Sequence, residues 1–208
     1  MDKVDICNNA LDLVGNGLHI TSLDEQSKEA DLLRRNYQNT VEQALTMFHF
    51  SFARKDEVIT EKMQIKDYIS IPYKYTYSIP SDVLTILRLE HYVGNTGDIM
   101  DSPIIKYNFR NIRNKKCIVT NDKAPFVMQY ICKVEDESLF SASFIDAIQY
   151  MLASKLATGL IHGGTGISMS DNLMQKGLSM LAFSAGQDAQ QGSEELLNHT
   201  PIFIKARG

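Results

Sequence analysis

The chain has few cysteines, no tryptophan and no long apolar run. None of its three cysteines belongs to a C-x-x-C pair (Cys7, Cys117 and Cys132). A disulfide framework or a zinc knuckle is therefore not expected, and reduced thiols fit folding in a cytoplasm. No stretch approaches the length of about 18 apolar residues that a membrane-spanning helix requires. The net charge of −4 over 208 residues argues against a protein that coats nucleic acid with its whole surface.

Proline is scarce and unevenly placed. Residues 1–50 and 138–200 contain none, whereas four of the five prolines fall in the middle third of the chain (Pro72, Pro80, Pro103 and Pro125). Proline is excluded from helix interiors and tolerated at strand edges and turns. The distribution therefore predicts a helical part, a β-rich part and a second helical part, followed by a short tail.

Helical periodicity supports this division at both ends. A short helix is expected over residues 3–14, and a longer one is expected to follow a capping box of Ser22 and Glu25 and to run to Phe48. Its buried stripe would comprise Ala30, Leu33, Tyr37, Val41, Ala44, Leu45 and Phe48. Two further helices are expected within residues 142–190, separated by Gly163 and Gly164, with a capping box from Ser168 to Asp171 opening the second.

The middle of the chain has the two-residue period of half-buried strands. Tyrosines alternate with polar residues over 73–79, and turn signals separate further apolar segments up to residue 134. We expect four or five antiparallel strands. The predicted fold is α+β: one domain over residues 1–192, in which a bundle of about four main helices (about 3–48 and 142–190) carries a central antiparallel β insertion (about 68–134). Residues 193–208 would form an extended C-terminal tail.

Catalytic constellations are weak in this sequence. The glycine-rich run from His162 to Gly166 lacks the lysine and Ser/Thr that a phosphate-binding P-loop needs, so a turn between helices is the better interpretation. The five histidines are scattered, without an H-x-x-x-H pair that could hold a metal. The acidic cluster from Glu135 to Glu137 is better placed to complement a helix N-terminus than to act as acid and base. We therefore expect no enzyme activity, no metal and no cofactor.

One segment is strongly basic. Residues 106–123 carry a net charge of +5, which leaves −9 for the rest of the chain. A basic hairpin on an acidic body could contact DNA phosphates or an acidic partner, or could simply be a solvated hairpin whose lysines discourage edge pairing. The candidate contact residues are Arg110, Arg113, Lys115 and Lys116. Alternating aromatics such as Tyr107 and Phe109 would ordinarily point into a core.

The C-terminal tail contains a short apolar run. Pro201 and the three residues after it favour an extended segment, which would either pack on its own domain or bind a partner. The candidate partner-binding residues are Pro201, Ile202, Phe203, Ile204 and Lys205.

Four further motifs follow one another along the chain: Phe50–Arg54, Tyr75–Val83, Phe144–Ile148 with Leu152–Ala157, and Ala185–Ala189. They are similar, in the same order, to W-N-F-A-R, Y-x-Y-x-L-P-x-D, F-x-x-A-L…L-A-x-x-L-A and A-x-x-D-A elements. These elements belong to the tail tubular protein A family, the head-to-tail adaptors of short-tailed phages, which the chain therefore resembles. The resemblance covers roughly residues 5–190. Phe50 replaces the family's tryptophan, and the tail has no counterpart.

The resemblance implies a structural virion protein without enzyme activity, located in the neck of the phage. Such adaptors form a dodecameric ring beneath the portal protein and continue the DNA channel, without reading its sequence, to the tail nozzle protein. It also implies that the C-terminal segment reaches a neighbouring subunit or the portal. Two alternatives remain open: a DNA-binding module that uses residues 106–123, and a glycan-cleaving tail component, which would need paired carboxylates in one cleft.

Overall fold

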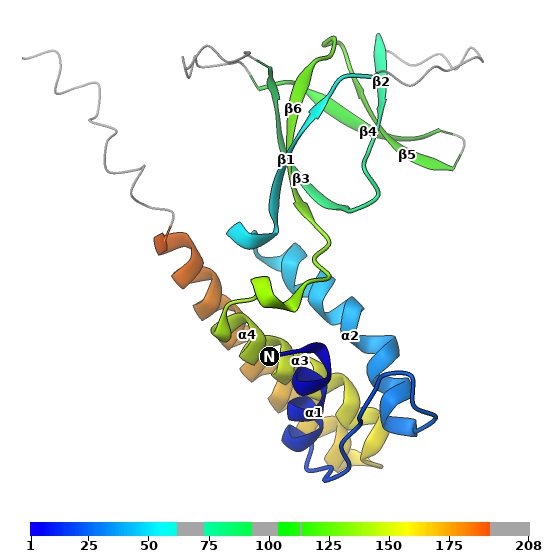
Figure 1. Cartoon of the computed structure of the whole chain (residues 1–208), viewed down its shortest axis with the longest axis vertical. Helices are drawn as coiled ribbons and strands as arrows, with labels where there is room; N and C mark the ends of the chain where they lie inside the picture. Colours follow the sequence, from blue (N-terminus) through cyan, green and yellow to red (C-terminus); the bar gives the residue numbers. More distant parts are fainter. Residues whose placement is uncertain (62–72, 93–103, 113, 192–208) are drawn as a thin grey trace, which may run out of the picture. The chain divides into compact units, whose positions relative to one another are not determined.

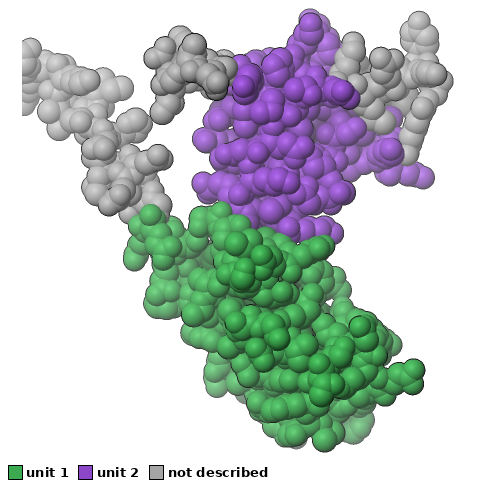
Figure 2. All heavy atoms as spheres, viewed as in Figure 1, with its two compact units in different colours: residues 1–52, 134–208 green, residues 53–133 purple. Residues whose placement is uncertain are grey.

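The structure is a computed structural model that describes residues 1–61, 73–92, 104–112 and 114–191. The chain divides into two compact units, which are coloured separately in Figure 2: unit 1 comprises residues 1–52 and 134–208, and unit 2 comprises residues 53–133. Unit 1 is helical, and unit 2 contains two small antiparallel sheets (Figure 1). The predicted α+β class, with four helices around an antiparallel β insertion, is confirmed.

Side-chain caps begin three of the four helices of unit 1. The helices are α1 (Lys3–Leu13), α2 (Lys28–Met47), α3 (Ala142–Leu160) and α4 (Gly164–Gln191). Asp2 and Asp5 form a reciprocal capping box at α1, and the hydroxyls of Ser27 and Ser141 accept from backbone N–H groups of α2 and α3.

Two predicted caps are wrong. Helix α2 begins at Lys28 behind Ser27, and the carboxylate of Glu25 instead accepts from the backbone N–H (2.8 Å) and hydroxyl of Thr21, closing a local turn before the helix. Helix α4 begins at Gly164, so the predicted cap residue Ser168 lies inside it. Short polar side chains cap equally well at several nearby positions, and the packing of each helix selects one.

Helix α3 is the centre of unit 1 and contacts α1, α2 and α4. It buries eleven of its 19 residues, as expected of a helix that is apolar on most sides. Helix α4 differs: it buries only five of its 28 residues (Gly166, Leu173, Gly177, Leu181 and Ser184). Gly177 permits its close approach to α3, because a Cβ there would lie 2.7 Å from Cγ and 3.0 Å from the backbone nitrogen of Met151.

Unit 2 contains six described strands in two sheets. The first sheet has the order β1-β6-β3, from β1 (Arg54–Ile59), β6 (Phe126–Cys132) and β3 (Val83–His91). The second has the order β2-β5-β4, from β2 (Tyr75–Ser78), β5 (Lys115–Thr120) and β4 (Tyr107–Ile112). All neighbouring strands are antiparallel, as predicted. The expectation that β structure begins near residue 68 is wrong, because β1 precedes it.

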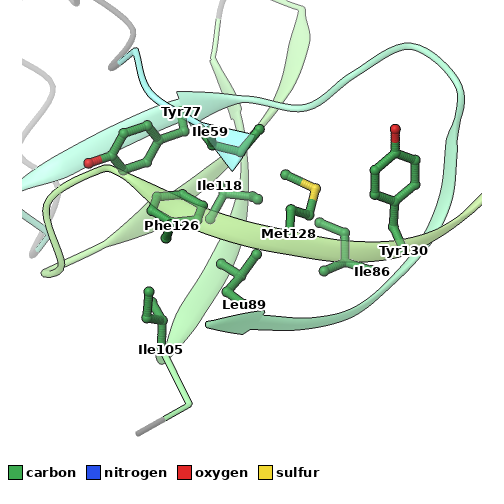
Figure 3. Packing of buried hydrophobic residues seen from close by; sticks show 9 residues of the cluster. All are labelled: Ile59, Tyr77, Ile86, Leu89, Ile105, Ile118, Phe126, Met128 and Tyr130. Atoms are coloured by element: carbon green, nitrogen blue, oxygen red, sulfur yellow. The ribbon is translucent and has the colours of Figure 1, made fainter. Parts of the chain in front are cut away.

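The two sheets share one hydrophobic core. Figure 3 shows Tyr77 and Ile118 of the second sheet together with Phe126, Met128 and Leu89 of the first. The ring of Tyr77 meets Phe126 edge to face at 4.8 Å between centroids, and its hydroxyl accepts from the backbone N–H of Ala124. The tyrosine-rich strand therefore packs as a core strand, as its two-residue period predicts.

Candidate partner-binding surfaces

Three of the four motifs that carry the family resemblance meet in unit 1. The backbone N–H and the hydroxyl of Ser51 donate to the two carboxylate oxygens of Asp188 at 2.7 and 2.6 Å. On either side of Ser51, the rings of Phe50 and Phe52 lie 4.8 and 5.1 Å from the ring of Phe144. Motifs separated by up to 137 residues in the chain therefore form one junction.

The junction is a buried aromatic cluster with one polar clasp. Phe50 is buried where the resembled family has tryptophan, and its ring meets that of Phe144 edge to face. Phe140 completes the cluster at 5.0 Å from Phe144. Edge-to-face pairs at such distances contribute about 0.5–1.5 kcal/mol each beyond the burial of their area. The residues of this junction are therefore structural, and they join the segment after α2 to the last turns of α4.

A second polar clasp in unit 1 surrounds Glu137. The hydroxyl of Tyr37 donates to Glu137 at 3.1 Å, and the ammonium of Lys3 lies 3.6 Å from the same oxygen and 4.8 Å from the ring centroid of Tyr37. Burial, together with the charge of Glu137, raises the pKa of Tyr37 well above its ordinary value. Part of the predicted acidic cluster thus ties α1 to α2 and to the turn before α3.

The predicted basic hairpin exists and consists of β4 and β5. Asn114 takes a positive φ of 60° at its turn, a conformation that asparagine tolerates. Arg110, Lys115 and Lys116 are exposed, and none of them belongs to an ion pair among the described residues. Arg113, the fourth predicted contact residue, lies outside the described residues.

The strand register divides the hairpin's cations between two faces. Arg110 lies opposite Cys117 and Ile112 opposite Lys115, so Arg110 and Lys115 share one face. Lys116 lies on the other face with Phe109, and its ammonium is 4.5 Å from the centroid of that ring. These charges form one basic segment in the sequence, but because they lie on two faces of the hairpin, a flat anionic surface cannot contact all of them at once.

Phe109 is 43% exposed, contrary to the expectation that the aromatics of this strand point into a core. Tyr107 packs against the core and meets Phe109 edge to face at 5.5 Å. An exposed ring beside a lysine is typical of a surface that contacts a partner or a nucleic-acid base. No signal in the alternation distinguishes Phe109 from Tyr107, because the difference depends on where the opposing sheet ends.

A cavity of about 540 Å³ lies next to this hairpin in unit 2. In its lining, Nε2 of His91 lies 3.7 Å from a carboxylate oxygen of Asp122, and the amide of Asn108 donates to the hydroxyl of Tyr73. Among the described residues that line it, no serine, cysteine or lysine is paired with a base in the way nucleophilic catalysis requires. Within the described part of the chain, no group of three His, Cys, Asp or Glu side chains could hold a metal ion.

A polar network covers one end of the first sheet. The ammonium of Lys55 lies 2.9 Å from Asp82, and the hydroxyl of Tyr130 donates to Glu57 at 2.9 Å. Burial and then the hydrogen bond to Glu57 raise the pKa of Tyr130. For Asp82, burial is the largest single effect and would raise the pKa, but the hydrogen bond and charge of Lys55, a backbone hydrogen bond and the hydroxyl of Tyr130 together outweigh it, and the pKa is lowered. The network joins β1, β3 and β6 and is structural.

The predicted tail residues, Pro201, Ile202, Phe203, Ile204 and Lys205, lie outside the described residues. Sequence reasoning missed a different surface: α4 exposes Ile167, Leu178 and Phe183. The available signal was a second apolar line on the same helix, which contains Ile167 and Leu178 and lies beside the predicted line of Leu173, Gly177 and Leu181. None of the described helices is long and apolar enough to cross a membrane.

Comparison of the sequence with protein-family models and with curated proteins found no match.

Proposed function

We propose that this protein is a head-to-tail adaptor of a short-tailed phage: a structural virion protein that forms a ring between the portal and the tail nozzle protein. The resemblance to the tail tubular protein A family rests on the four motifs, and the proposed ring and its partners follow from that family. The ring would be a dodecamer around the DNA channel. The chain would carry no cofactor and catalyse no reaction.

The observation that supports this proposal is the junction of Ser51, Asp188 and Phe144. Motifs that matched by chance would be expected to scatter over the fold, because nothing would require residues 50–54, 144–148 and 185–189 to be neighbours. Here a hydrogen bond of 2.6 Å joins Ser51 to Asp188, and the ring centroids of Phe52 and Phe144 are 5.1 Å apart. The three motifs therefore have a structural reason to occur together in one sequence, because their side chains pack against one another.

The exposed apolar side chains of α4 also suit a ring subunit. A subunit in a closed ring needs two different patches that contact each other when one copy is rotated onto the next. Exposed apolar residues on one side of a helix, as Ile167 and Leu178 are, are typical of such interfaces, whereas single scattered ones are ordinary surface.

The test is assembly with the portal protein of the same phage. We expect mass photometry of the mixture to show a complex with about twelve copies of the chain per portal ring, and electron microscopy to show a ring beneath the portal. A chain that stays monomeric at all concentrations and never binds this portal would contradict the proposal.

The basic hairpin favours a second candidate, non-specific binding of DNA. Its exposed cations are Arg110 and Lys115 on one face and Lys116, beside Phe109, on the other, and none of these cations belongs to an ion pair among the described residues. Each phosphate contact that is lost should flatten the salt dependence of the logarithm of affinity by about 1. Arg110→Ala/Lys115→Ala should therefore flatten the slope by about 2, whereas Lys28→Ala/Lys176→Ala in unit 1 should not. No binding to duplex DNA at low salt would exclude this candidate.

A further inference from the structure

Helix α4 has a second apolar line besides the one that packs on α3. It consists of Ile167, Met174, Leu178 and Ala185, with Asp171 among them, and is called the outer stripe here. Spacings of three, four and seven residues keep these side chains on one side of a helix with 3.6 residues per turn. Ile167 is 61% and Leu178 is 37% exposed.

The outer stripe is uncovered in the described part of the protein. Among the described elements, α3 is the one extensive neighbour of α4, and it contacts the line of Leu173, Gly177 and Leu181, which lies roughly a quarter of a turn around the helix from the outer stripe. Asp171 takes part in none of the ion pairs of the described residues. An apolar line with one free carboxylate fits a short apolar segment that carries a positive charge.

We propose that, in the free subunit, residues 201–205 of the same chain bind back onto this outer stripe. The chain between α4 and this segment is long enough for the segment to reach the outer stripe. Leu178 lies about 20 Å along the helix from its end at Gln191, at about 1.5 Å per residue. The ten residues from 192 to 201 can span roughly 33 Å when extended, which suffices to reverse direction and return to Leu178.

Residues 202–205 and the outer stripe are chemically complementary. In an extended segment, Ile202 and Ile204 point the same way, so both can lie on one apolar line. A segment that starts at Leu178 and runs toward the N-terminus of α4 covers about 10 Å in three residues, which brings Lys205 beside Asp171. The apolar pairs and the single charge pair are therefore in register.

The segment that binds the outer stripe comes from the same copy of the chain. A tether of about ten residues holds the segment at an effective concentration of roughly millimolar near its own helix. In a micromolar solution, the segment of another copy cannot compete with this. Each free subunit therefore covers its own apolar line, and a partner must displace the segment before it can use that line. This inference concerns the single subunit and stands independently of the adaptor proposal.

Disulfide trapping in the full-length chain tests the proposal. Asp171→Cys/Lys205→Cys should form an intramolecular disulfide on mild oxidation at about 1 μM protein, identified by peptide mapping of the monomer band. The control is Lys176→Cys/Lys205→Cys, in which the cysteine is closer to Lys205 along the chain but lies on the opposite side of α4; it should form the bond at least tenfold more slowly. Equal rates, no bond in either variant, or bonds only between mixed isotope-labelled copies would each overturn the proposal.

Limited proteolysis provides an independent readout that needs no cysteine. Trypsin should cleave after Lys205 at least tenfold faster in Leu178→Glu than in the unchanged chain, because the charge expels the apolar segment. Phe183→Glu is the control, since Phe183 is 57% exposed on another side of the same helix. Circular dichroism must show equal helix content in both variants. Unchanged cleavage in a folded Leu178→Glu variant would overturn the proposal.

Discussion

Ser51 and Asp188 are bonded twice although 137 residues separate them in the chain. The backbone N–H of Ser51 donates to one carboxylate oxygen of Asp188 at 2.7 Å, and its hydroxyl donates to the other at 2.6 Å. Hydrogen bonds to a charged acceptor are about twice as strong as neutral ones. This pair joins the end of the first helical segment of unit 1 to the last turns of α4, beside the cluster of Phe50, Phe52 and Phe144.

Replacement of Asp188 by alanine should destabilise the helical unit. Two donors lose a charged acceptor, which we expect to cost about 1–3 kcal/mol of unfolding free energy. Ser51→Ala removes only the hydroxyl bond and should cost about 1 kcal/mol. Urea denaturation followed by circular dichroism measures both. Asp146→Ala is the matched control, because Asp146 is an exposed carboxylate on α3. An Asp188→Ala cost no larger than that of the control would show that the pair contributes nothing.

Two glycines of α4 should respond in opposite directions to alanine. Alanine stabilises a helix interior by about 1 kcal/mol relative to glycine. At Gly177, however, the new Cβ would meet Met151 at 2.7 Å and its backbone nitrogen at 3.0 Å, so overpacking of about 1–3 kcal/mol exceeds that gain. At Gly186 nothing lies within 4 Å of the new Cβ.

We therefore expect the thermal midpoint to fall for Gly177→Ala and to rise for Gly186→Ala. Differential scanning calorimetry of the two variants beside the unchanged chain measures both shifts. If Gly177→Ala proved as stabilising as Gly186→Ala, the close approach of α3 and α4 would be refuted.

Asp82 should make the stability of unit 2 dependent on acid pH. Its pKa is lower in the folded state than its ordinary value: burial alone would raise the pKa, but the hydrogen bonds from Lys55, the backbone and Tyr130, with the charge of Lys55, together outweigh burial. The unfolded chain then takes up the proton first as the pH falls. The stabilisation is thus present above about pH 4, the ordinary pKa of aspartate, and is lost as the pH falls through the lower folded value.

Urea midpoints measured between pH 6 and pH 3 should therefore fall less steeply for Asp82→Asn than for the unchanged chain. Asp56→Asn provides the comparison, since Asp56 is an exposed carboxylate on strand β1 of the same sheet. Parallel pH profiles for the unchanged chain and Asp82→Asn would rule out this linkage.

The three thiols should differ in reactivity. Burial raises the pKa of Cys7 to about 12, and it also raises the pKa of Cys117 and Cys132. Cys132 alone among them is partly exposed. At pH 8 a disulfide reagent should therefore modify Cys132 first and reach the other two only on unfolding. Cys132→Ser should remove the fast phase; a native Cys7 that reacts at the same rate would show that the α1 packing is wrong.

The sequence by itself determined the order of helical and β segments and most of the residues that they bury. Helices and strands each have their own period, and burial of one face imprints that period on the chain. The stripe of α2 from Ala30 to Leu45 and the alternation around Tyr77 are therefore visible without a structure. The absence of proline from residues 138–200 marks the two long helices in the same way.

The tertiary structure decided what depends on contacts between distant residues. Strand β1 begins with four charged residues and gives no strand signal, yet it forms because Arg54 to Ile59 pair with β6. The bonding of Ser51 to Asp188 and the division of Arg110 and Lys116 between two faces likewise depend on the register of one segment against another. Such pairings are stabilised by hydrogen bonds and packing across space, and a local period carries no record of them.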